Sequence, residues 1–181
     1  ILALSAFLAR GSSFELIAAS QTPEMVRSTD RRVTELLAYG YERSKTFRLL
    51  VECIQRSDTI VYVEFGVCAF GHLDACVLPF VANTSKGRYL RIVLTARLDR
   101  TDREHVLALI GHELQHAVEI VEHPEVVDVQ GMLDMYRRIG FPLKGRSGYE
   151  TSAARAAERA VLNELKAPIG LDDGTFSCCA R

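Results

Sequence analysis

Hydrophobic residues in the segment 22–58 recur every three or four positions, the spacing that places them on one face of an α-helix. Thr22, Pro23 and Glu24 have the residue types of a helix start. The apolar residues of this pattern are Val33, Leu36, Leu37, Tyr41, Phe47, Leu50, Val51 and Ile54. Gly40 is a candidate break, so the segment predicts one helix or two consecutive helices.

After position 58 the chain becomes rich in β-branched and aromatic residues, which is typical of strands. Residues 59–66 and 74–82 form two such runs, and glycines bound the segment between them. Residues 87–98 alternate between polar and apolar side chains, and residues 83–87 have the composition of a turn. Three short strands with short connections predict a small antiparallel sheet.

A strong helical segment follows this sheet and ends at His123, because Pro124 cannot continue it. Asp99 or Thr101 is its candidate N-cap, and Glu104 lies near the capping-box position.

Two further helices are predicted over residues 124–140 and 149–167, with a loop over residues 141–148 between them. Gly140 is the expected end of the first of these helices. Strands followed by helices predict an α+β fold, in which an antiparallel sheet of about three strands packs against a helical core.

The chain has 181 residues, of which 48% are hydrophobic and 25% are charged, and its formal net charge is -1. This length and composition predict one globular domain, which we place at residues 21–170. The charge balance gives no reason to expect a nucleic-acid partner. Oligomeric state cannot be read from these features.

The first nine residues are an apolar run that is too short to cross a bilayer. Two interpretations remain open: the remnant of an export signal within residues 1–20, or a helical turn that packs on the domain. Localisation therefore stays open between export and the cytoplasm. Residues 171–181 are polar and predict a flexible tail.

The five cysteines cannot all pair within one chain, because their number is odd. Cys68 and Cys76 flank a short segment and are either a disulfide that closes a hairpin or two buried thiols. Cys178 and Cys179 lie in the predicted tail. No CxxC spacing is present, so a cysteine zinc site is not expected.

His112, Glu113 and His116 form an HExxH motif within the long apolar helix. Positions i and i+4 lie on one face of a helix, so the two imidazoles can bind one Zn²⁺ ion together. Glu113 is rotated by about 100° around the axis and can accept a proton from a zinc-bound water as general base. The alternative is that both histidines face solvent or only form hydrogen bonds.

A catalytic zinc site usually has three protein ligands, so a third must come from elsewhere in the chain. Glu150, in the run of small residues that begins the last helix, is our choice. His123 and Glu158 remain alternatives. Glu119 lies too far along the helix from His112 to share an ion with it, so we place it beside the site or on the surface.

HExxH on one helix with a glutamate at a following helix resembles the gluzincin branch of the zincin metallopeptidases. The resemblance covers residues 59–165 and implies Zn²⁺ held by His112, His116 and Glu150, with Glu113 as general base. It also implies a peptide or protein substrate, which the edge of the strand at residues 87–98 can align by strand addition. The metzincin pattern does not fit, because it requires other residues at Glu119 and Glu122.

Hydrolysis also requires a donor to the developing oxyanion, for which Tyr136, Tyr149 and His123 are candidates. His72 and His105 are not expected to bind metal. A catalytically inactive zincin-like scaffold, with structural metal or none, is the second interpretation. A di-iron helical bundle would need a second ExxH pair, which the sequence lacks.

Overall fold

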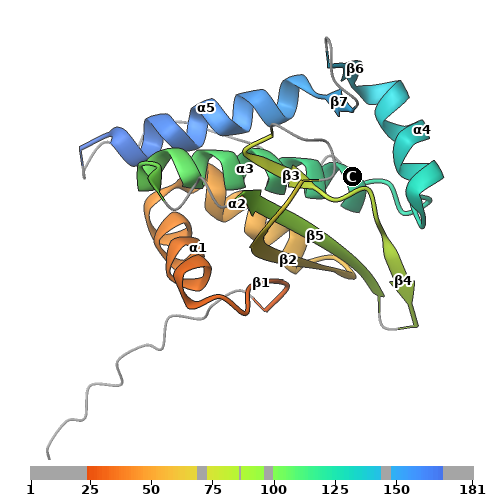
Figure 1. Ribbon diagram of the computed structural model, residues 1–181, viewed down its shortest axis with the longest axis horizontal. Coiled ribbons are helices and arrows are strands. Elements are labelled where there is room, and N and C mark those ends of the chain that lie inside the picture. Colours follow the sequence, from red (N-terminus) through yellow and green to blue (C-terminus); the bar gives the residue numbers. More distant parts are fainter. Residues whose placement is uncertain (1–23, 69–72, 86, 96–99, 144–147, 169–181) are drawn as a thin grey trace, which may run out of the picture.

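The computed structural model describes residues 24–68, 73–85, 87–95, 100–143 and 148–168 (Figure 1). Within these ranges the chain forms five α-helices, a five-stranded sheet and a separate two-stranded sheet. The predicted α+β class is confirmed, and the described residues do not form the four-helix bundle of a di-iron protein.

Several predictions concern residues outside the described ranges. These are the N-terminal segment 1–20, His72, the tail 171–181 with its two cysteines, and the cap Asp99.

The large sheet is mixed, which corrects the antiparallel arrangement that we predicted. Its strands are β1 (Val26–Arg27), β2 (Thr59–Gly66), β3 (Ala75–Val77), β4 (Ala82–Thr84) and β5 (Gly87–Thr95). β2 pairs with β1 and β5 in parallel, whereas β3 and β4 pair with β5 antiparallel. The chain between β2 and β5 is long enough for a parallel crossover, and it adds β3 and β4 on the far side of β5.

β5 is therefore a central strand with partners on both sides. The prediction that its edge aligns a substrate is wrong, because β2 and β3 already take its backbone hydrogen bonds. The run 74–82 forms two short strands with Pro79 between them, since proline cannot donate a ladder hydrogen bond. Asn83 belongs to β4 rather than to a turn.

The first helical segment contains two helices, α1 (Arg31–Arg43) and α2 (Lys45–Gln55). The predicted start near Glu24 is wrong, because the chain first forms β1 and Asp30 caps α1 by accepting from the Arg32 N–H. The break lies at Ser44, which caps α2, and not at Gly40. A Cβ at Gly40 would lie 2.8 Å from the Leu107 side chain, so this glycine allows close helix packing.

The motif helix α3 spans Arg103–Val121, and Asp102 is its N-cap residue, without a side-chain capping bond. α4 (Val129–Ile139) begins later than predicted, because the Asp128 side chain accepts from the Gly131 N–H and fixes its start. Gly140 ends α4 as predicted.

The last helix, α5 (Ser152–Lys166), is capped by Thr151, whose side chain accepts from the Ala154 N–H. The residues predicted as its first turn instead form β7 (Tyr149–Glu150), which pairs with β6 (Phe141–Pro142). Glu150 is therefore on a strand that leads into the helix and not on the helix itself.

α3 contacts β3 and β5 of the sheet, and α5 lies alongside α3 on the side away from the strands (Figure 1). A Cβ at Gly111 would lie 2.8 Å from the Val161 side chain, so glycine at this position allows the two helices to approach. Of the small residues at the start of α5, Ala154 and Ala157 are buried, whereas Ala153 is exposed. The close contact brings the start of α5 to the face of α3 that carries the HExxH motif.

Arg88 fixes the C-terminal end of α3 from strand β5. Its side chain is nearly buried, and Nη1 donates to the carbonyls of Ile120 at 2.9 Å and His123 at 3.1 Å. The guanidinium also pairs with Asp58 at 3.2 Å. The last carbonyls of a helix have no partner within it. Here Arg88 adds charged donors to those that the His123 and Val126 N–H groups supply.

Cys68 and Cys76 form a disulfide, which resolves the two interpretations of this pair. The bond joins the segment after β2 to β3, while Cys53 is buried in the core. Among the described residues, none of the helices has the length and apolar character needed to cross a membrane.

Candidate metal centre

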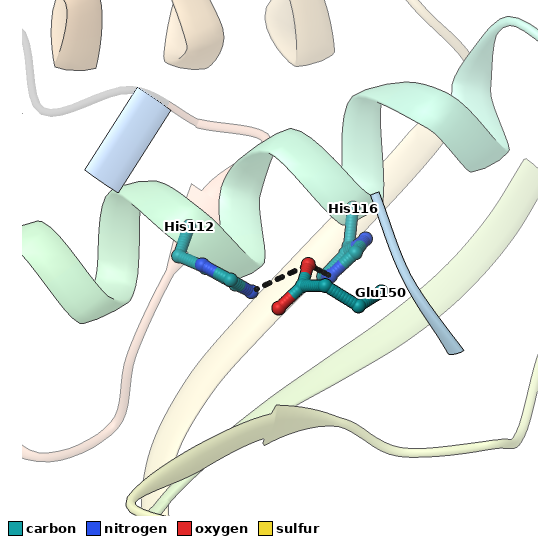
Figure 2. A group of neighbouring side chains, drawn as sticks. All are labelled: His112, His116 and Glu150. Atoms are coloured by element: carbon teal, nitrogen blue, oxygen red, sulfur yellow. Dashed lines mark ion pairs between the residues drawn. The ribbon is translucent and has the colours of Figure 1, made fainter. Parts of the chain in front are cut away.

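The structure brings together the three residues predicted as metal ligands. His112 and His116 project from one face of α3 toward the Glu150 carboxylate on β7 (Figure 2). Glu150 Oε1 lies 3.4 Å from His112 Nε2 and 3.6 Å from His116 Nε2. One potential ligand atom from each residue lies within 4.8 Å of the others.

Both separations from Glu150 Oε1 exceed the usual length of a direct hydrogen bond and are close to the spacing of two ligands on one ion. An N–H···O hydrogen bond is usually about 2.7–3.2 Å long. Two atoms that each lie about 2.0–2.1 Å from a tetrahedral zinc ion are about 3.3 Å from each other. The donor set of two imidazoles and one carboxylate is also one that zinc accepts in open sites.

Glu150 is fixed by its own strand and by the start of α5. Glu150 pairs with Phe141 across the two-stranded sheet, and its Oε1 accepts a hydrogen bond from the Thr151 N–H at 2.8 Å. Oε2 faces the guanidinium of Arg155, with 3.4 Å to Nε. The carboxylate thus presents Oε1 to the histidines.

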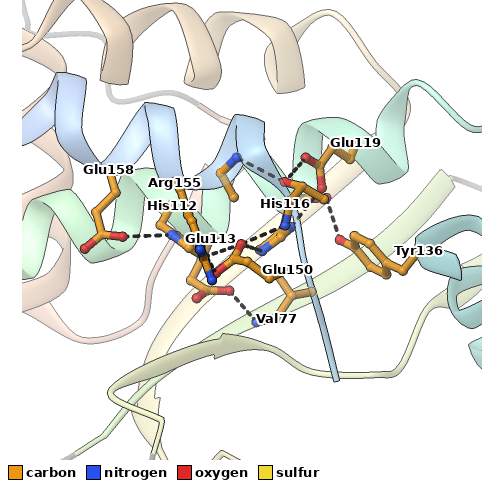
Figure 3. A network of polar contacts seen from close by, with 11 residues as sticks. Val77, His112, Glu113, His116, Glu119, Tyr136, Glu150, Arg155 and Glu158 are labelled. Carbon is orange, nitrogen blue, oxygen red and sulfur yellow. Dashed lines mark hydrogen bonds and ion pairs between the residues drawn. The ribbon is translucent and has the colours of Figure 1, made fainter. Parts of the chain in front are cut away.

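Each histidine is held through Nδ1 by a second carboxylate, which leaves Nε2 directed at Glu150 (Figure 3). His112 Nδ1 lies 3.0 Å from Glu158, and His116 Nδ1 lies 2.8 Å from Glu119. Thr151 in turn donates its hydroxyl to Glu119 at 2.6 Å. Histidines that ligate metal are commonly oriented in this way, because a carboxylate on the other nitrogen fixes the tautomer and the ring.

Glu113 lies beside the three residues and is almost fully buried. Its Oε2 accepts from the Val77 N–H at 2.8 Å, so the carboxylate is held against strand β3. Burial raises the pKa of Glu113, although the neighbouring His116 and His112 oppose this effect. A carboxyl group with a raised pKa is better suited to accept and return a proton near neutral pH.

Without a metal ion, the group is a set of ion pairs. Burial by itself would lower the pKa of His116, but the carboxylates of Glu119 and Glu150 outweigh it and raise that pKa to about 10. Burial by itself would raise the pKa of Glu150, but His116, His112 and the Thr151 N–H lower it to about 2. A metal ion must therefore displace the proton of His116, because imidazole ligates metal only in its neutral form.

The other candidates have different positions. Glu158 and Glu119 bind the Nδ1 atoms rather than joining the Nε2 group, and His123 pairs with Glu125 at 2.9 Å. The Tyr136 hydroxyl donates to the His116 carbonyl at 3.2 Å, and its ring meets the His116 ring edge-on.

Tyr149 packs against the hydrophobic core, and His105 is an exposed residue on the first turn of α3.

Two contacts of the site residues could not be predicted from the sequence. The Val77 N–H belongs to the backbone, so no residue type in the sequence identifies it as a donor. The contact between Arg155 and Glu150 is not part of a recognisable sequence motif. The contact between Glu119 and His116 could have been predicted, because the two residues lie three positions apart on one helix and so share a face.

A separate cavity of about 340 Å³ lies against α1 and the first turns of α3. It is lined by Arg32, Glu35, Leu36, Tyr39, Phe65, Thr101, Arg103 and Val106. It shares no lining residue with the His112, His116 and Glu150 group, so we do not assign it to the same site.

Comparison with protein-family models, curated proteins and solved structures finds no significant match to this chain. The gluzincin resemblance therefore rests on the HExxH motif and the glutamate that follows it. A function for the chain has to be argued from the chemistry of the residues at this site.

Replacing Glu119 with glutamine is expected to weaken zinc binding about 10- to 100-fold, the usual effect of losing a carboxylate partner of a ligating histidine. The equivalent change at Glu158 should weaken it less, because that side chain is 35% exposed against 7% for Glu119 and water can take its place. Competition with a zinc chelator measures both affinities. An unchanged affinity in the Glu119→Gln variant would contradict this role.

Proposed function

We propose that this protein is a zinc-dependent hydrolase that cleaves peptide bonds. The observation that carries the proposal is the convergence of His112, His116 and Glu150, with both Nδ1 atoms held by carboxylates. Such an arrangement leaves room for an open coordination position, which catalytic zinc sites require.

A zinc ion bound there supplies Lewis acidity, which lowers the pKa of water and polarises a carbonyl group. Glu113 removes a proton from the attacking water as the water oxygen bonds to the carbonyl carbon. The C–N bond then breaks, and Glu113 returns the proton to the leaving nitrogen. The products are a carboxylic acid and an amine, and Glu113 is regenerated.

The position of β3 supports a peptide as substrate. In the described part of the sheet β3 is a terminal strand, and Val77 lies within hydrogen-bond distance of Glu113. An extended chain laid along a terminal strand forms backbone hydrogen bonds with it. A peptide held there would place a backbone carbonyl close to Glu113, so β3 replaces β5 as the proposed substrate-aligning strand.

The test is hydrolysis of a mixed peptide library by the zinc-loaded protein, with new termini detected by mass spectrometry. We expect cleavage by the zinc-loaded protein and none after the metal is removed with a chelator. Readdition of zinc should restore cleavage. A protein that binds zinc but cleaves no peptide would contradict the peptidase function.

The ion pairs of the site favour a second candidate, a scaffold that acts by binding and carries structural metal or none. His112 and His116 already lie 2.8–3.6 Å from carboxylate oxygens, so a metal ion is not needed to balance the charges. The carboxylates are those of Glu119, Glu150 and Glu158. In this case the library remains uncleaved, and zinc is either absent or held in a closed four-ligand site.

A further inference from the structure

Arg155 places a cation directly beside the candidate metal centre. It projects from the first turns of α5, and its Nε lies 3.4 Å from Glu150 Oε2 (Figure 3). Its Cζ lies 4.8 Å from the centroid of the Phe141 ring, so the ring supports one face of the guanidinium. Glu150 therefore has one oxygen toward the histidines and the other toward Arg155.

The outer edge of this guanidinium is open to a ligand. The Arg155 side chain is 48% exposed, and among the described residues its charged group forms an ion pair with Glu150 and a ring contact with Phe141. The two Nη atoms form the fork with which arginine binds a carboxylate through parallel hydrogen bonds. Phe141, itself 36% exposed, adds apolar surface next to that fork.

Orienting Glu150 does not account for this arrangement. The single contact to Glu150 is longer than an ordinary hydrogen bond, and it does not use the two-pronged geometry that holds a carboxylate firmly. The Thr151 N–H already fixes Glu150 at 2.8 Å. The position and the open edge of Arg155 fit recognition of an anion that arrives with the substrate.

We infer that Arg155 determines substrate specificity by binding a carboxylate next to the cleaved bond, an inference that rests on the proposed peptidase function. Successive backbone units of a peptide are about 3.8 Å apart. A carbonyl at the metal position therefore brings the carboxylate of the adjoining residue within reach of Arg155. That carboxylate is either the C-terminus of the peptide or an aspartate or glutamate side chain.

The test uses two small probes that bind zinc through a hydroxamate group. Succinic monohydroxamic acid carries a free carboxylate, and its primary amide is the uncharged match. Isothermal titration calorimetry gives the affinity of each probe for the zinc-loaded parent, for Arg155→Gln and for the control Arg159→Gln, an exposed arginine on the same helix. Zinc content is measured in all three proteins.

In the parent and in Arg159→Gln we expect the carboxylate probe to bind about tenfold tighter than the amide, a ratio that one good charged contact can supply. In Arg155→Gln the ratio should fall to about one, with the amide probe little changed. An unchanged ratio in Arg155→Gln, equal binding of both probes by the parent, or equal weakening of both probes would overturn the inference. Equal weakening would show that Arg155 acts only on the site itself.

Failure of the proposed function has a different signature, because the parent would then take up no zinc or would cleave no peptide in the library. The source of the carboxylate is assigned on peptides that are cleaved. Cleavage of each such peptide is compared with cleavage of two altered versions. In one version the C-terminus is amidated, and in the other the acidic residue next to the cleaved bond, for example Asp, is replaced with its amide, Asn. Loss of cleavage in either arm supports the inference, and indifference to both overturns it.

Discussion

Exchange of Glu113 for glutamine is expected to slow peptide hydrolysis about a thousandfold, within the usual contribution of general acid–base catalysis. Glutamine has nearly the same shape and retains an oxygen that can accept the Val77 N–H. It cannot take a proton from water at neutral pH. The proton transfer should be lost while the surrounding packing is kept.

Steady-state hydrolysis of a peptide from the library measures this effect, with zinc content determined on the same samples. Glu122→Gln is the matched control, because it is an exposed glutamate just after α3 and should retain parent activity. A Glu113→Gln variant that holds zinc and still hydrolyses peptides at the parent rate would contradict the role of Glu113.

The second large effect is expected in stability, from replacing Arg88 with methionine. This change removes the donors to the carbonyls of Ile120 and His123 at the end of α3. These two carbonyls keep the backbone N–H donors of His123 and Val126, so the loss is that of the charged hydrogen bonds themselves. Each hydrogen bond to a charged group contributes about 1.5–3 kcal/mol, so we expect the free energy of unfolding to fall by about 3–4 kcal/mol.

Urea denaturation followed by circular dichroism measures this free energy. Arg91→Met is the control on the same strand, because Arg91 is 53% exposed and pairs with Glu64 at the surface. An exposed pair of this kind contributes about 1 kcal/mol or less. Equal losses in the two variants would show that Arg88 does not stabilise the end of α3.

Local periodicity predicted the helices and β2 well, because a helix or strand with one apolar face has a repeating pattern in the sequence itself. The direction of β5 relative to β2 could not be predicted, since it depends on where the chain between them crosses. The observed starts of α1, α4 and α5 also differ from the predicted ones. Asp30, Asp128 and Thr151 are the capping residues, but several nearby polar residues were equally suitable from the sequence.

Within the candidate site, the spacing of His112 and His116 predicted their shared face, because it is a property of any helix. The choice of Glu150 agrees with the convergence found in the structure, but it was made on the assumption of a helical position that is wrong. The distinction between Glu150, which faces Nε2, and Glu158, which faces Nδ1, depends on the packing of α5 against α3. Sequence spacing alone does not contain that information.

The central claim is that His112, His116 and Glu150 bind one zinc ion, and zinc titration of the metal-free protein tests it most directly. Competition with a chromophoric chelator gives both stoichiometry and affinity for the parent, for Glu150→Gln and for the exposed control Glu125→Gln. We predict one zinc per chain in the parent and in the control, and an affinity at least about a hundredfold weaker in Glu150→Gln, since a ligand is lost. A parent that binds no zinc, or a Glu150→Gln variant that binds it as tightly as the parent, would contradict the account.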